Sequence, residues 1–140
     1  MDNKVLDFIS RKKYQKSAVI FETETFAEMA IRLCESKDIN SGRVFSACTF
    51  LGKDIYNKLK SDRRYIPKEN TAYSICFGLR LTFAEASCLL QKARYSLVPV
   101  SPDDKYRELL VEMLVTDFTY IPDCNKVLEH YGFRLLGKVK

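Results

Sequence analysis

Three observations predict an all-α fold for this chain of 140 residues. Apolar residues recur at the three- and four-residue spacing of helices along most of the chain, and several segments open on a capping residue. Residues 40–60 hold two short amphipathic segments joined by a very short break, which is a helix-turn-helix pattern. A hairpin pattern near residues 76–97 also recurs 38 residues later in the chain.

The composition is that of a soluble globular protein with a real core. Hydrophobic residues make up 46% of the chain and charged residues 29%, and the length suits one domain. The longest apolar runs span only a few residues, so we expect no transmembrane helix and a cytoplasmic location. The cysteines lack the close pairs of a zinc site, which predicts reduced thiols on apolar helix faces: Cys34, Cys48, Cys76, Cys88 and Cys124.

Residues 1–24 are expected to form a first unit, followed by five helices. The first unit has a basic run at 11–16, either a solvated tail or an arm along phosphates, after a short helix with apolar positions Val5, Leu6, Phe8 and Ile9. The five helices are predicted at 25–37, 41–48, 53–60, 68–77 and 82–93. Thr25 with Glu28, and Thr82 with Glu85, have the spacing of capping boxes.

The helices expected at 41–48 and 53–60 form the helix-turn-helix. Asn40 or Ser41 can cap the first, whose apolar stripe is Val44, Phe45 and Cys48. The second has an apolar face of Leu51, Ile55 and Leu59 and a polar face of Lys53, Tyr56, Asn57 and Lys60. The break at residues 49–52 is expected to turn one apolar residue inward.

Positive charge is concentrated on the second of these helices and the loop after it. Residues 53–68 contain six lysines and arginines and two aspartates, a net charge of +4, whereas the whole protein carries +5. A DNA backbone would lie along such a field. An ordinary helical corner with a solvated second helix is the alternative.

A longer stretch beyond this loop carries a family resemblance. The run Phe77-Gly78-Leu79-Arg80-Leu81-Thr82-Phe83-Ala84-Glu85, followed by Leu89-Leu90-Gln91-Lys92-Ala93-Arg94-Tyr95, is similar to one in a bacterial branch of the phage-repressor-type (XRE-like) DNA-binding domains. The resemblance covers about residues 26–100 and implies a five-helix repressor-like helix-turn-helix bundle at 25–100. Many members have glutamine at the start of the second helix, where this chain has Ser41-Gly42-Arg43, and glycine in the turn, where it has Thr49. A residue other than glycine fits this turn if its backbone avoids positive φ.

Residues 101–140 are expected to form a C-terminal helical hairpin packed on the same core. The pattern of Glu85, Leu89-Leu90, Tyr95 and Leu97 returns as Asp123, Val127-Leu128, Phe133 and Leu135, with chance similarity of amphipathic hairpins as the alternative. The helices are predicted at 102–117 and 122–131. Their apolar face is too large to stand free in water; it consists of Leu109, Leu110, Met113, Leu114, Val127 and Leu128. We expect most of this face to pack on the same core, with part of the outer side of the hairpin left for a dimer contact.

The sequence offers no catalytic constellation. His130 is the only histidine, and Cys124, six positions upstream, would lie well around the helix from it, so we interpret His130 as a structural residue at a helix end. No phosphate loop, dinucleotide fingerprint or HExxH motif is present. We therefore expect no enzymatic activity and no bound cofactor or metal.

The first functional hypothesis is a transcriptional regulator that reads double-stranded DNA in the major groove through residues 53–60. Asn57 would bind adenine and Lys53 guanine, while phosphates would be contacted by Tyr56, Lys60, Arg63, Arg64 and Lys68. A homodimer would suit two half-sites. The alternative is a protein-interaction module, adaptor or antitoxin-like, on a degenerate helix-turn-helix fold, because Asp54 and Asp62 would repel phosphates if they faced them.

Overall fold

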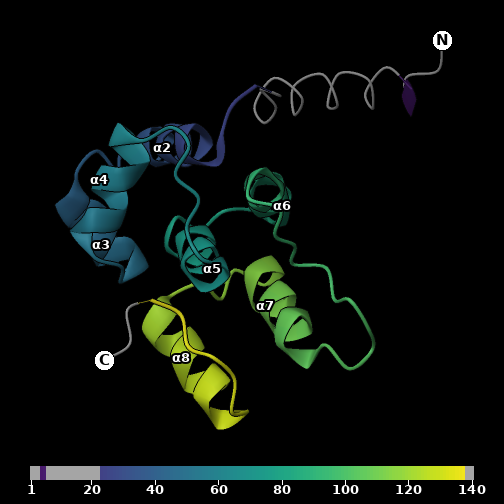
Figure 1. Ribbon diagram of the computed structural model, residues 1–140. Helices are drawn as coiled ribbons and strands as arrows, with labels where there is room; N and C mark the ends of the chain where they lie inside the picture. The colour runs from purple at the N-terminus through teal and green to yellow at the C-terminus, as the bar shows by residue number, and fades with distance from the viewer. Residues whose placement is uncertain (1–3, 6–22, 138–140) are drawn as a thin grey trace.

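The protein is all-helical throughout the part that the structure, a computed structural model, describes, residues 4–5 and 23–137. The described residues contain no strand, and seven helices follow one another: α2 (Phe26–Ser36), α3 (Gly42–Thr49), α4 (Lys53–Ser61), α5 (Glu69–Gly78), α6 (Phe83–Lys92), α7 (Lys105–Val115) and α8 (Ile121–His130) (Figure 1). The predicted opening helix and the basic run at 11–16 lie outside the described residues, except for Lys4 and Val5. None of the described helices is long and apolar enough to span a membrane.

Local capping sequences set where several helices begin. Thr25 Oγ1 accepts a hydrogen bond from the backbone N–H of Glu28, and the Glu28 carboxylate accepts one from the N–H of Thr25 at 3.0 Å. Thr82 and Glu85 make the same reciprocal pair at the start of α6. Ser41 caps α3. Both predicted capping boxes are therefore confirmed, and each satisfies amide groups that a helix start leaves without partners.

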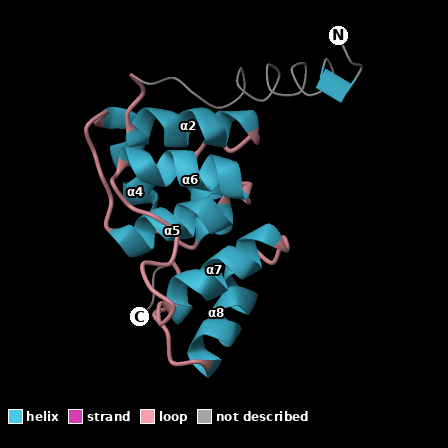
Figure 2. Cartoon of the chain, turned by 90° about the vertical axis from the view of Figure 1, so that its right-hand side faces the viewer, coloured by secondary structure: helices cyan, strands magenta, loops and turns pink. Residues whose placement is uncertain are grey.

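Helix α5 lies at the centre of the molecule. Its residues 72–77 are all buried, and it contacts α3, α6 and α8 (Figure 1). Figure 2 shows α2 and α6 side by side, with α7 and α8 below α5. The largest fully buried side chains come from helices and loops on all sides and form one cluster, which includes Phe26, Phe45, Tyr73, Phe77, Leu90 and Leu110.

Helices α5–α6 and α7–α8 form two successive hairpins with matching ends. Helix α8 begins and ends 38 residues after α6. The residue at which the chain leaves each hairpin is left-handed, with φ +62° at Arg94 and +73° at Gly132. Directly after it, Tyr95 N–H donates to the Leu90 carbonyl at 2.9 Å, and Phe133 N–H donates to the Leu128 carbonyl at 2.8 Å. The sequence repeat therefore corresponds to equivalent helix ends, each closed by a left-handed residue.

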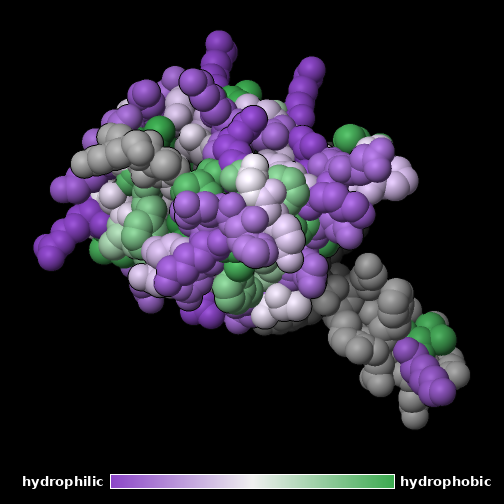
Figure 3. All heavy atoms as spheres, turned by 90° about the horizontal axis from the view of Figure 1, so that it is seen from below, coloured by the Kyte–Doolittle hydropathy of each residue, from purple (hydrophilic) through white to green (hydrophobic). Residues whose placement is uncertain are grey.

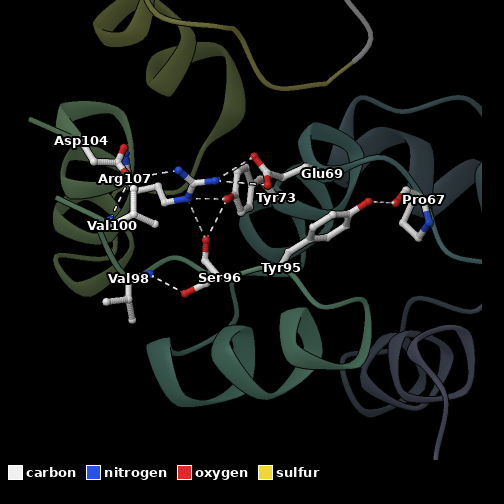
Figure 4. A network of polar contacts seen from close by, with 9 residues as sticks. All are labelled: Pro67, Glu69, Tyr73, Tyr95, Ser96, Val98, Val100, Asp104 and Arg107. Atoms are coloured by element: carbon white, nitrogen blue, oxygen red, sulfur yellow. Dashed lines mark hydrogen bonds and ion pairs between the residues drawn. The ribbon is translucent and has the colours of Figure 1, made fainter.

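Arg107 of α7 ties the second hairpin to α5 and to the loop after α6 (Figure 4). Its Nη2 donates to both carboxylate oxygens of Glu69 at 3.2 Å, and its Nη1 donates to Asp104 at 2.9 Å. Its Nε lies 3.1 Å from the Ser96 carbonyl oxygen and 3.2 Å from the Tyr73 hydroxyl. The hydrogen bond to Asp104 raises the pKa of Arg107, while burial raises that of Tyr73 to about 12. One guanidinium thus joins three segments of the chain.

The chain returns after α8 to the middle of the fold. Leu136 is buried, and its backbone N–H and carbonyl both pair with the side-chain amide of Asn125, at 2.7 and 3.0 Å. The Gly137 N–H donates to Ser74 Oγ of α5 at 2.7 Å. Gly137 also lies against Phe50, because an added Cβ there would be 3.0 Å from the Phe50 Cβ. The C-terminal segment therefore packs beside the turn between α3 and α4.

Candidate nucleic-acid interface

Residues 50–52 join α3 to α4, and α4 packs against both α2 and α3. Leu51 in this turn is buried, which confirms the expected inward apolar residue. Thr49 is also buried; its hydroxyl donates to the Phe45 carbonyl at 2.8 Å and accepts a 3.3 Å hydrogen bond from the Leu51 N–H. The turn therefore has its own internal hydrogen bonds as well as a place in the core.

The C-terminal cap of helix α3 is Phe50, whose backbone is left-handed with φ at +58°. Thr49 is the last residue of α3 and does not have positive φ. It therefore meets the condition under which a residue other than glycine can take this position. Gly78 of α5 allows this corner to approach closely. An added Cβ at Gly78 would lie 2.6 Å from the Cα of Thr49 and 2.8 Å from the Cys48 carbonyl oxygen. The glycine that the close packing requires thus comes from another helix.

The exposed face of α4 is polar and basic. Lys53, Asn57 and Lys60 are exposed and share one side of the helix, since they lie at positions i, i+4 and i+7. The start of this face adjoins the first residue of α3, because a Cβ at Gly42 would be 3.4 Å from the Lys53 Cβ. The donors of α4 therefore point into solvent beside the N-terminal end of α3.

Tyr56 does not belong to this face, and its predicted phosphate contact is wrong. Its side chain is 4% exposed, with its ring centroid 5.4 Å from that of Phe45. Burial raises the pKa of Tyr56. The reason is that α4 packs on two helices at once, so its buried surface extends from Leu59 to Tyr56 and leaves Ile55 only half-buried. Lys60 lies over the Tyr56 ring, with Nζ 5.8 Å from its centroid.

Val44 is a second correction within the helix-turn-helix. The sequence placed it in the apolar stripe of α3, but its side chain is 41% exposed. Helix α3 has only eight residues and buries Phe45 and Thr49, which are four positions apart. Cys48 is half-buried. The buried stripe of α3 is therefore narrower than the sequence pattern predicted.

The loop after α4 continues the basic surface. Arg63, Arg64 and Lys68 are all exposed. Asp62 Oδ1 accepts a hydrogen bond from the Arg64 N–H at 3.0 Å, which fixes the first turn of the loop. Arg63 makes an exposed 3.5 Å ion pair with Glu28 of α2. Six of the seven predicted site residues therefore lie at the surface of α4 and this loop, and the charge of Arg63 is partly compensated.

The thiols are buried or half-buried, and the histidine lies at a helix end. All five cysteines are free: Cys34, Cys76 and Cys124 are buried, and Cys48 and Cys88 are half-buried. Burial raises the pKa of Cys34 to about 12 and that of Cys124 to about 11, so these thiols are protonated at neutral pH. His130 is exposed in the last turn of α8. The described residues contain no group of His, Cys, Asp and Glu placed to hold a metal ion.

Sequence patterns missed one surface feature, a groove of about 500 Å³ between the ends of α3 and α5 and the turn before α8. We call it the apolar groove; Cys48, Phe50, Gly78, Phe118 and Tyr120 contribute to its walls. These residues come from three separate segments, so no periodicity links them. The only local signal was the pair of aromatic residues at positions 118 and 120.

Comparison with known proteins adds no family to this description. No protein-family model, curated protein or solved structure matches the chain. The candidate interface therefore depends on the geometry of α3, α4 and the basic loop alone.

Proposed function

We propose that the protein is a DNA-binding transcriptional regulator with a phage-repressor-type helix-turn-helix at residues 25–100, extended by the hairpin at 101–140. One observation carries this proposal: a helix with an exposed face of Lys53, Asn57 and Lys60 follows α3 after a three-residue turn and leads into an exposed basic loop. A cytoplasmic location belongs to the same proposal.

Each exposed residue has a role that follows from its chemistry. The Asn57 amide can donate to and accept from the major-groove edge of adenine, and Lys53 can donate to the acceptors of guanine. Lys60, Arg63, Arg64 and Lys68 would contact phosphates, which position the protein without reading sequence. Tyr56 acts indirectly, because its packing on Phe45 fixes the orientation of α4.

Selection of bound duplexes from a random pool tests the proposal directly. We expect the full chain to enrich one motif. On that motif Asn57→Ala should weaken binding by about 1–3 kcal/mol and relax the choice of base at one position. Gln91→Ala, which removes an exposed side-chain amide from α6, is the matched control and should change nothing. Failure to enrich any motif would contradict sequence-specific binding.

A protein-interaction module is the second candidate, and two observations favour it. Asp54 is exposed in the first turn of α4, where it would repel a phosphate placed at that end. The Arg63–Glu28 ion pair also removes part of the positive field. This candidate predicts that Asp54→Asn leaves duplex binding undetectable. The DNA-binding proposal predicts that the same substitution tightens it.

A further inference from the structure

The apolar groove carries an unusual concentration of exposed aromatic side chains. Phe50, Phe118 and Tyr120 line it with 38%, 41% and 62% of their surfaces exposed, and Val44 is exposed along its continuation past α3. The Phe50 and Tyr120 rings meet edge to face at 6.1 Å. Figure 3 shows that apolar side chains on the lower face of the molecule form patches between hydrophilic ones. A monomer gains nothing by leaving such side chains in water.

The groove combines a hollow with an exposed aromatic ring. Its wall contains buried Phe77 and half-buried Cys48 and Gly78, while Tyr120, which also lines it, is largely exposed. A volume of about 500 Å³ is enough to receive aromatic side chains. One surface therefore contains both a cavity and a group of the kind that could fill it.

Charges along the groove have both signs. Arg80 and Asp117 form an exposed ion pair at 3.4 Å on its rim, and Asp123 lies nearby. Lys37 and Asp38 line the adjoining hollow of about 560 Å³. A uniformly acidic or basic partner would meet like charges here. A second copy satisfies both signs when the two-fold axis places Arg80 of one copy opposite Asp117 of the other, because such an interface joins one patch to itself and forms the pair twice.

We propose that the apolar groove is the interface of a two-fold homodimer, in which Tyr120 of each copy enters the groove of the other and Arg80 of each faces Asp117 of the other. The groove includes no residue of α4, so the face of Lys53, Asn57 and Lys60 stays uncovered. The inference goes beyond DNA binding and is measured without DNA, so its failure and that of the proposed function are distinguishable.

Sedimentation equilibrium of the full chain, with no DNA present, tests the interface. We expect a dimer at about 100 µM and at least tenfold weaker association for Tyr120→Ser, since aromatic residues are enriched among the few interface residues that carry most of the binding energy. Tyr131→Ser is the matched control: Tyr131 is 61% exposed at the opposite end of α8, and its loss should leave association unchanged. Circular dichroism should show both variants folded.

Charge substitutions test the self-complementarity separately. Arg80→Asp makes the rim acidic, and Asp117→Arg combined with Asp123→Lys makes it basic, so each variant alone should be monomeric. An equimolar mixture of the two should restore association as a heterodimer. Three results would each overturn the proposal: a monomeric wild type at the same concentration, equal effects of Tyr120→Ser and Tyr131→Ser, or a mixture that stays monomeric.

Discussion

Gly78→Ala should disturb the helix-turn-helix from outside it. The new Cβ would lie 2.6 Å from both the Cα and the Cγ2 of Thr49 and 2.8 Å from the Cys48 carbonyl oxygen. Two of these three atoms belong to the backbone, so relief requires α3 to move away from α5. Overpacking of this kind costs about 1–3 kcal/mol, and alanine returns at most about 1 kcal/mol through its better helix propensity. Because two of the contacts are with backbone atoms, the cost lies at the upper end of this range, about 3 kcal/mol, which leaves a net loss of about 2 kcal/mol.

Urea unfolding followed by circular dichroism measures this loss, and a thermal melt should show a fall of about 8 °C for a domain of this size. Gly42→Ala is the matched control within the same motif, because its Cβ would meet the Lys53 Cβ at an ordinary 3.4 Å. That variant should be as stable as the wild type or slightly more so. Equal stability of all three proteins would refute the close approach of α3 and α5.

Three further predictions concern charge, burial and the C-terminal hairpin. Hydrogen bonds from Val100 and Arg107 lower the pKa of Asp104 below its ordinary 3.8, so its contribution to stability is complete above that pH and is lost as the pH falls further. Urea titrations between about pH 5 and 2 should therefore show a shallower acid loss for Asp104→Asn than for wild type. Cys76→Ser should cost about 1–3 kcal/mol and half-buried Cys88→Ser clearly less, and equal losses in urea unfolding would contradict the assigned burial. A chain ending at Ser101 should lose cooperative thermal unfolding and bind a hydrophobic dye, and an unchanged melt would contradict the continuous core.

Features set by adjacent residues were predictable from the sequence. The capping boxes at Thr25 and Thr82 need only a threonine and a glutamate three positions later, and both helices begin there. The inward position of Leu51 likewise follows from one apolar residue in a short turn. The 38-residue repeat appeared in the sequence because two hairpins close with the same backbone geometry. Each of these is decided within one or two turns of chain.

Features set by distant neighbours were not predictable. Tyr56 is polar enough to suggest a solvent-facing position, but α2 and α3 together cover it. Val44 is apolar yet exposed, because α3 is too short to bury it along with Phe45. The Arg107 network joins residues up to 38 positions apart, and no spacing rule connects them. The apolar groove escaped notice for the same reason.

The salt dependence of duplex binding tests the central claim most directly. If Lys60, Arg63, Arg64 and Lys68 each neutralise one phosphate, the logarithm of the binding constant should fall with the logarithm of salt concentration at a slope of about −3.6. Fluorescence anisotropy should show this slope for wild type and about −2.7 for Arg64→Ala. Lys126→Ala, which removes an exposed cation from α8, should keep the wild-type slope. A slope near zero, or equal slopes for wild type and Arg64→Ala, would contradict a nucleic-acid interface on α4 and its loop.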